Sequence, residues 1–166
     1  FGALFQTAIA DGYATKLGLT NRTPDDIAVI QDFLTVMANG EADFTLTFRA
    51  LSEAAETPDK EPELRALFTE TAPLDDWLAR WRQRLEKESR TASQIAAAMR
   101  RANPVIIPRN HQIEAAIKAA VSSNDLGPFH LLVDELARPF DDRPGIDDLK
   151  LPPKPEEIVH ATFCGT

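Results

Sequence analysis

The side chains best suited to metal or nucleotide chemistry are scattered along this chain. His111, His130 and His160 stand alone, and none follows the His-x-x-x-His or His-Glu-x-x-His spacing that places two imidazoles on one helix face. The seven glycines are too widely spread for two of them to build a phosphate-cradling loop. We therefore expect no metal site, no cofactor site and no catalytic residue within this chain.

Paired acids occur at Asp75 and Asp76, and again at 141–142 and 147–148. Adjacent residues on a helix point about 100° apart, so Asp75 and Asp76 do not face one Mg²⁺ ion together. Their position near the start of an expected helix is explained by the favourable interaction of acids with a helix N-terminus. The later pairs lie among prolines, where solvated charge is the ordinary outcome.

Cys164 is the candidate redox residue, because its thiol lies close to the end of the chain. A lone cysteine is commonly a small buried hydrophobic residue. An exposed terminal thiol instead exchanges with a second cysteine or reports redox state. The chain has no second cysteine, and both interpretations stay open.

Apolar residues recur at helical spacing along almost the whole chain, whereas the alternation typical of strands is hard to find. We predict an all-α fold, an irregular bundle of about seven or eight helices with an extended proline-rich C-terminal tail. Residues 1–138 are the expected helical region, and residues 139–166 are the expected acidic and proline-rich tail ending in Cys164.

Residues that favour helix ends predict most helix limits. The expected helices are a first one to about Leu17 before Gly18, a second from Thr23 and Pro24 to Asn39, a third from Asp43, a short one over 64–68 after a surface break at 57–62, a long one over 73–87, one from Thr91 through Met99, one opened by Arg109 or Asn110, and a last one over 126–137.

Apolar stripes predict which side chains these helices bury. In the long helix over 73–87, Trp77 and Trp81 share one stripe and are expected to face the same neighbour, which makes both candidate interface residues. Elsewhere the expected buried residues include Leu4, Phe5, Ile9, Ile27, Ile30, Phe33, Phe44, Phe48, Leu51, Ile113, Ala116, Ile117 and Ala120.

The charge distribution argues against nucleic-acid binding, because 26 acids outnumber 18 lysines and arginines. Between Trp77 and Lys118, however, nine bases face only three acids. This local excess indicates either a helix surface paired with acidic neighbours or a docking face for an acidic partner.

The N-terminal residue is Phe1 rather than methionine, and the chain enters an apolar helical pattern without a cap, so we expect a piece of a longer protein. No signal-peptide pattern is present, and no apolar stretch approaches the roughly 18 residues of a membrane span. We expect a cytoplasmic protein without membrane contact.

Several segments, taken in order, resemble the C-terminal part of the selenoprotein O family. They are Lys16-Leu17-Gly18-Leu19, Asp43-Phe44-Thr45 leading to Phe48-Arg49-Ala50-Leu51, Trp77 with Trp81-Arg82, Met99 to Asn103-Pro104, Arg109-Asn110, Pro139-Phe140 and Cys164-Gly165-Thr166. The resemblance runs from about Ala10 to the end, and its strongest parts are the Asn-Pro-x-x-x-x-Arg-Asn block at 103–110 and Cys164 near the C-terminus.

This resemblance implies a protein adenylyltransferase with a protein-kinase-like fold, a pseudokinase that binds ATP with Mg²⁺ and transfers AMP to Ser, Thr or Tyr hydroxyls of protein substrates. The family's nucleotide-binding lysine, its acidic partner and its metal-binding residues belong to a region that this chain lacks. The segment from Asp43 to Thr45 is not the kinase Asp-Phe-Gly element, because it lacks the glycine and precedes a helix. No catalytic residue is carried over.

The resemblance also gives three residues an expected role. The family's C-terminal cysteine, Cys164 here, can pair with a cysteine of the catalytic region, while the selenocysteine position of some members is absent. Arg109 and Asn110 either begin a helix, with Asn110 capping amides and Arg109 pairing with an acid, or brace this region against the kinase-like lobe.

Two hypotheses of function follow. In the first, the chain is the helical, non-catalytic C-terminal part of a protein adenylyltransferase, inactive alone, and its partners are the missing N-terminal kinase-like lobe and the substrates of the whole enzyme. In the alternative, it is a stand-alone helical interaction module whose basic face, from Arg80 to Arg109, binds an acidic partner.

Overall fold

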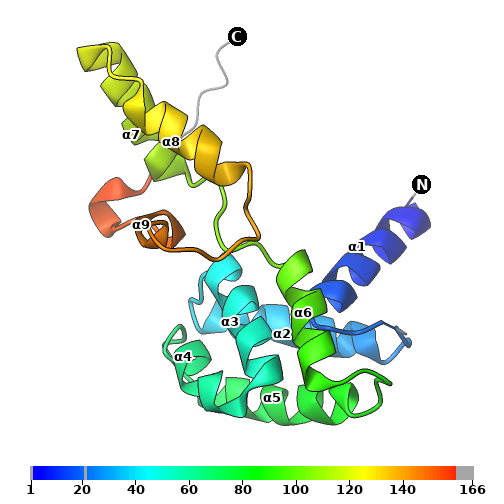
Figure 1. Cartoon of the computed structure of the whole chain (residues 1–166). Coiled ribbons are helices and arrows are strands. Elements are labelled where there is room, and N and C mark those ends of the chain that lie inside the picture. The colour runs from blue at the N-terminus through cyan, green and yellow to red at the C-terminus, as the bar shows by residue number, and fades with distance from the viewer. Residues whose placement is uncertain (1, 21, 160–166) are drawn as a thin grey trace. The chain divides into compact units, whose positions relative to one another are not determined.

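The structure, a computed structural model, describes residues 2–20 and 22–159, and every regular element within them is helical. Nine α-helices and two short 3₁₀ helices are formed in this part of the chain (Figure 1). The all-α prediction is thereby confirmed. The chain divides into two compact units, Phe1–Pro104 and Val105–Thr166, each with its own buried apolar cluster.

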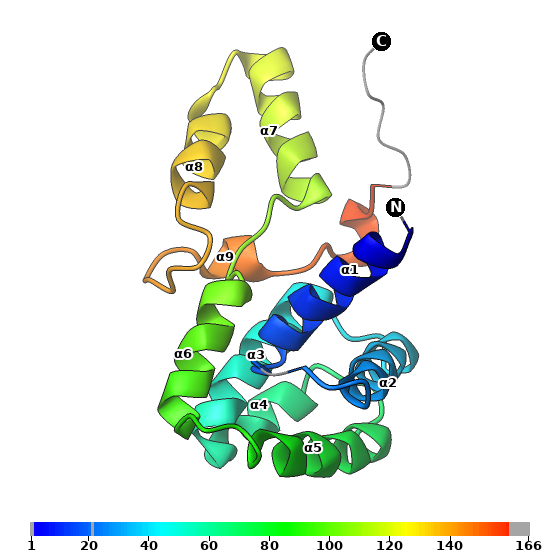
Figure 2. The ribbon, with the colours of Figure 1, turned by 90° about the vertical axis from the view of Figure 1, so that its right-hand side faces the viewer.

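The first unit is built from six α-helices and one 3₁₀ helix in its described residues. They are α1 (Gly2–Lys16), α2 (Asp26–Asn39), α3 (Phe44–Glu56), η1 (Pro58–Lys60), α4 (Glu61–Arg65), α5 (Ala72–Leu85) and α6 (Ala92–Ala102). Helix α3 packs along α6, α2 packs on α5, and α1 contacts both α2 and α6. Helix α5 crosses the lower end of the unit in both views (Figures 1 and 2).

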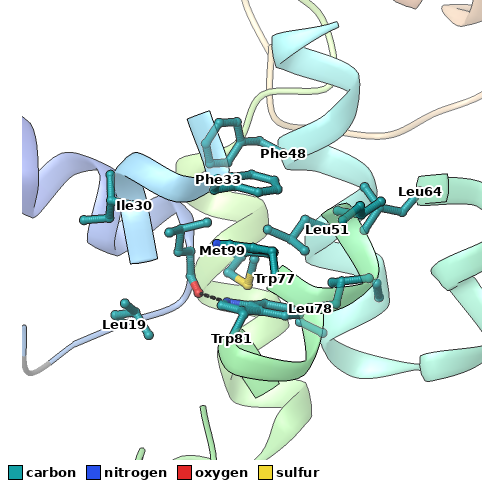
Figure 3. Close-up of a cluster of buried hydrophobic side chains, with 14 of the residues drawn as sticks. Leu19, Ile30, Phe33, Phe48, Leu51, Leu64, Trp77, Leu78, Trp81 and Met99 are labelled. Carbon is teal, nitrogen blue, oxygen red and sulfur yellow. Dashed lines mark hydrogen bonds between the residues drawn. The ribbon is translucent and has the colours of Figure 1, made fainter. Parts of the chain in front are cut away.

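Four aromatic rings lie at the centre of the first unit. Phe33 of α2 stacks on Trp77 of α5 with 4.0 Å between ring centroids, and Trp77 stacks on Trp81 at 5.6 Å (Figure 3). Phe48 of α3 meets Phe33 edge-on at 5.3 Å. None of the four side chains is more than 1% exposed. Their burial therefore contributes much of the hydrophobic stabilisation of this unit.

Several helix ends confirm the predictions from local sequence. The carboxylate of Asp43 accepts a hydrogen bond from the amide of Leu46 at 2.9 Å and caps α3. Thr91 and Gln94 form a complete capping box at the start of α6. Gly18 follows α1 with φ of +79°, a conformation that glycine adopts without strain.

Two predictions about helix limits are wrong by a few residues. Helix α2 begins at Asp26 instead of near Pro24, because the carboxylate of Asp26 accepts the amide of Thr23 at 2.7 Å and closes a turn ahead of the helix. The predicted surface break at 57–62 is partly helical, since it contains η1 and the first residues of α4.

The second unit contains α7 (Asn110–Ser123), α8 (Gly127–Leu136) and α9 (Asp147–Lys150), followed by the 3₁₀ helix η2 (Pro155–Glu157). Helices α7 and α8 pack as a hairpin (Figure 1). Ile146 is 1% exposed and packs with Val105 and Ile106. The described part of the proline-rich tail is therefore held against its own unit and is interrupted by two short helical turns.

Some apolar residues predicted to be buried are exposed. Leu4 is 79% exposed on the first turns of α1, Ile27 is 40% exposed at the start of α2, and Phe44 is 44% exposed at the start of α3. In the second unit, Ile117 is 51% exposed. Helical periodicity predicts which face of a helix is apolar, but burial also requires a neighbour that covers it. Phe5 and Ile9 of α1 are exposed for the same reason.

Candidate functional site

Arg109 and Asn110 mark the start of α7 in the second unit, as predicted. Arg109 occupies the N-cap position and is only 7% exposed, and its guanidinium donates to the carbonyl of Lys150 at 2.8 Å. Asn110 is the first helical residue, and its side chain is exposed. Asn110 therefore does not hold the cap position that one interpretation gave it. Arg109 therefore binds the end of α9 to the start of α7, and we call this contact the Arg109 clamp.

Gln112 contributes to the same clamp, although the sequence did not single it out. Its side-chain amide donates to the carbonyls of Asp148 and Leu149 at 3.3 and 3.2 Å. With Arg109, it engages the carbonyl end of α9, where unsatisfied oxygens attract donors and positive charge. Both residues stabilise the second unit internally, and a role of Arg109 and Asn110 at an interface stays a prediction.

Trp77 and Trp81 lie inside the first unit with 0% exposure. The indole of Trp77 donates to the carbonyl of Val29 at 2.9 Å. The indole of Trp81 donates to the carbonyl of Leu17, also at 2.9 Å (Figure 3). Each ring thus satisfies its polar atom while burying its apolar face. The shared neighbour of the two rings is the core of this unit, and their expected interface role stays a prediction that this burial does not favour.

Asn103 forms a buried polar junction, which its place in the Asn-Pro-x-x-x-x-Arg-Asn block did not predict. Its amide nitrogen donates to the carbonyl of Lys16 at 2.9 Å and to the hydroxyl of Ser52 at 3.0 Å, and its amide oxygen accepts from the Lys16 ammonium at 3.2 Å. The residue is 0% exposed. One side chain therefore ties together the ends of α1 and α6 and the middle of α3.

Lys16 completes this junction. Its ammonium also donates to the carbonyl of Ala102 at 2.9 Å, at the C-terminal end of α6. Burial lowers the pKa of Lys16 below its usual value. The ammonium lies 5.4 Å from the centroid of Phe48, within the range of a cation–π contact. The positive charge of Lys16 therefore interacts with the C-terminal end of α6 and with the face of Phe48.

The basic stretch between Trp77 and Lys118 is largely paired with acids. At least five of its nine bases form ion pairs inside the first unit. The pairs are Arg80 with Asp32, Arg82 with Glu61, Arg84 with Asp26 and Glu88, Arg90 with Glu88, and Arg100 with Glu53 and Glu56. This confirms the interpretation of the charge as a surface paired with acidic neighbours. Lys87, Arg101 and Lys118 remain exposed.

The most buried of these pairs joins the start of α2 to α5. Arg84 donates to the two carboxylate oxygens of Asp26 at 2.6 and 3.1 Å, and Asp26 is 1% exposed. Burial raises the pKa of Asp26, but hydrogen bonds from Arg84 and Thr23 outweigh it, so the pKa lies below its usual value. Asp26 is therefore a charged structural anchor.

Among residues 2–20 and 22–159, no three His, Cys, Asp or Glu side chains gather in a way that could hold a metal ion. Asp75 pairs with Arg65 at 2.7 Å, which adds to the helix-start explanation for that acid. Cys164 and His160 lie outside the described residues. None of the described helices has both the length and the apolar character that crossing a membrane requires.

Comparison with known proteins identifies relatives of the chain. A family model described as protein adenylyltransferase SelO matches residues 1–137. Proteins named protein nucleotidyltransferase YdiU match all 166 residues, with 50% identity in Rhodopseudomonas palustris (strain BisB5), 51% in Bradyrhizobium sp. (strain BTAi1) and 46% in Rhizobium meliloti (strain 1021). The chain spans 34% of the length of each of these three relatives.

Proposed function

Because the chain belongs to the SelO family of protein adenylyltransferases, we propose that it is the helical, non-catalytic C-terminal part of such an enzyme. The whole enzyme transfers AMP from ATP to Ser, Thr or Tyr hydroxyls of its protein substrates. This chain supports a kinase-like catalytic lobe in the remaining part of the polypeptide. The setting proposed for the enzyme is the cytoplasm.

One observation carries the proposal: residues of the segments that resemble the family are used here to hold helices together. Asn103 bridges three helices through its buried amide, and Trp81 donates to the carbonyl of Leu17. Arg109 holds the carbonyl of Lys150. Side chains engaged with backbone in this way stabilise a scaffold and leave the chemistry to another part of the protein.

The proposal assigns ATP and Mg²⁺ to the lobe outside this chain. The two deeply buried carboxylates described here, Asp26 and Glu88, are each engaged by arginine. A carboxylate that already binds a guanidinium is poorly placed to coordinate a divalent ion, which prefers several oxygen ligands. This supports a structural role for the acids of the first unit.

An ATP titration on two proteins tests the assignment. The 166-residue chain and the longer protein that contains it are titrated with ATP by calorimetry, with and without Mg²⁺, and AMP transfer to protein is followed by intact mass. The longer protein is expected to bind ATP and to transfer AMP in the presence of Mg²⁺, whereas the short chain does neither. Mg²⁺-dependent binding of ATP to the short chain would overturn the proposal.

A redox role for Cys164 is a second part of the proposal, supported by the likeness of the Cys164-Gly165-Thr166 segment to the cysteine segment of the family. In the longer protein, oxidation is expected to join the Cys164 sulfur to a cysteine of the catalytic lobe, with loss of two protons and two electrons to the added oxidant. Non-reducing peptide mass spectrometry of the oxidised longer protein detects this linkage, and Cys164→Ser removes it. Recovery of Cys164 only as a thiol under oxidising conditions contradicts the idea.

The alternative function, a stand-alone module with a basic docking face, has weaker support. The guanidinium groups of Arg80 and Arg84 each lie 2.6 Å from a carboxylate of the same unit, and that of Arg100 pairs with Glu53 and Glu56. Charges neutralised within the fold attract an external acidic partner weakly. Binding of an acidic peptide that weakens steeply with salt would favour this alternative over the support role.

A further inference from the structure

An apolar groove runs between α7 and α8 in the second unit. Its volume is about 540 Å³, and every residue that lines it is apolar. Ile113 and Ile117 contribute from α7, and Phe129, Leu132 and Val133 contribute from α8. A two-helix hairpin has too few neighbours to cover both inner faces, so the groove stays open to solvent.

The rim of the groove exposes large apolar side chains. Ile117, Phe129 and Val133 are each 51% exposed. Three such residues along one open face form a contiguous apolar surface, which is typical of a site that is covered by another polypeptide. Ile117 was expected to be buried from its helical spacing, and it is exposed because the groove that it lines is open.

The lining of the groove indicates what kind of segment covers it. Because no polar side chain lines it, an extended peptide would leave its own backbone N–H and C=O groups without partners on that side. A small polar ligand would likewise find nothing to fix its orientation. A helix satisfies its backbone internally and can present an apolar stripe to such a groove. The lining therefore favours a helix.

We propose that this helix comes from the part of the longer protein outside the present chain and docks between α7 and α8. The chain spans 34% of its relatives, so about two thirds of each relative's length lies outside the match. The family model matches residues 1–137 and so includes both helices of the groove. A groove inside the region common to the family is expected to be covered by the family's own polypeptide. The inference rests on the proposed support role.

Hydrogen exchange on the short chain and on the longer protein tests the docking directly. Amides of α7 and α8 are expected to exchange at least about tenfold more slowly in the longer protein, because a covered groove opens less often. Equal exchange rates in the two proteins would overturn the proposal. Protection in the short chain that increases with its concentration would also overturn it, since a second copy would then cover the groove.

Matched double variants separate the groove from general surface effects. Ile117→Ser with Val133→Ser alters the rim, whereas Val121→Ser with Leu131→Ser alters residues of the same helices that do not line the groove and are 82% and 52% exposed. In the longer protein, the rim pair is expected to lower the Tm by at least about 2–4 °C and the control pair to change it little. In the short chain, the two pairs are expected to change the Tm by similar small amounts, because their residues are already half exposed or more. Equal shifts for both pairs in the longer protein contradict the docking.

The outcomes distinguish this inference from the proposed function. If the longer protein shows no ATP-dependent AMP transfer but protects α7 and α8, the support of an adenylyltransferase is wrong and the docking stands. If it transfers AMP while α7 and α8 exchange as in the short chain, the proposed function stands and the docking is wrong.

Discussion

Asn103 forms the buried polar junction between α1, α3 and α6 of the first unit. It is 0% exposed and bonds to Lys16 and Ser52. We expect Asn103→Ala to lower the free energy of unfolding by about 2–4 kcal/mol, because buried polar groups on two other helices lose their partner. Urea denaturation followed by circular dichroism measures the change.

Asn110→Ala is the matched control, since Asn110 belongs to the same sequence block but is exposed. Its effect on the short chain is expected to stay within about 0.5 kcal/mol. If the two variants are equally stable, the junction around Asn103 contributes no more than an ordinary surface contact.

The buried carboxylates of Asp26 and Glu88 determine how the free energy of unfolding is expected to change at acid pH. Burial raises the pKa of each group, but hydrogen bonds from Arg84 and from Thr23 or Thr20 bring both below the usual values of 3.8 and 4.5. A carboxyl whose pKa is lowered by folding stabilises the protein fully above its unfolded pKa and ceases to do so as pH falls through its folded pKa. Stability is therefore expected to fall below about pH 4.5.

Asp26→Asn tests this pH dependence. The variant is expected to lose about 2–4 kcal/mol at pH 7, because the buried Arg84 guanidinium loses one of its two carboxylate partners and keeps only Glu88. Its stability should then decrease less than that of the wild type between pH 5 and pH 3. Asp32→Asn, which removes an exposed pair with Arg80, is expected to cost no more than about 1 kcal/mol. Parallel pH profiles for wild type and Asp26→Asn would contradict the assignment.

At the scale of single elements, replacing Gly12 or Gly18 by alanine is expected to change the stability of the chain in opposite directions. Gly18 has φ of +79°, and a Cβ there would lie 2.7 Å from Ile95 Cγ2 and 2.9 Å from Met99 Sδ. Gly18→Ala is expected to destabilise the chain by about 1–3 kcal/mol through strain and overpacking. Gly12 lies within α1 with no atom within 4 Å of an added Cβ, so Gly12→Ala should stabilise by about 0.5–1 kcal/mol. Thermal unfolding of both variants measures the signs, and equal signs would show that α1 does not end as described.

Many other element ends were predictable because capping is a local effect. The Asp43 cap and the Thr91 capping box depend only on residues three positions away, so both were found from sequence. The start of α2 was predicted a few residues too early, because several residues from Thr23 to Asp26 favour a helix start. The hydrogen bond from the Thr23 amide to the Asp26 carboxylate decides which of them begins the helix.

At the scale of the whole molecule, the two units differ in how much core they contain. The large apolar cluster, with Phe33, Trp77 and Trp81, lies entirely in residues 1–104, whereas the second unit buries Val105, Ile106 and Ile146 in a small cluster. We expect residues 1–104 alone to unfold cooperatively with heat, and residues 105–166 alone to be largely unfolded, because a small core cannot offset chain entropy.

Circular dichroism melts of the two separate fragments measure this difference, with the 166-residue chain as the reference. A broad, non-cooperative melt of residues 1–104 would show that the first unit depends on the second. The division expected from sequence, residues 1–138 and 139–166, concerns the arrangement of the longer protein and stays a prediction.

The sequence by itself determined the helical class, most helix ends and the apolar stripe of Trp77 and Trp81, because these follow from neighbours within one or two turns. Only the tertiary structure decided that Asn103 is buried beside Lys16, 87 residues earlier, and that Arg84 engages Asp26 across 58 residues. The tertiary structure also decided that Ile117 lines an open groove and is exposed. The physical reason is that periodicity specifies which face of a helix is apolar, whereas burial and pairing depend on which distant face meets it.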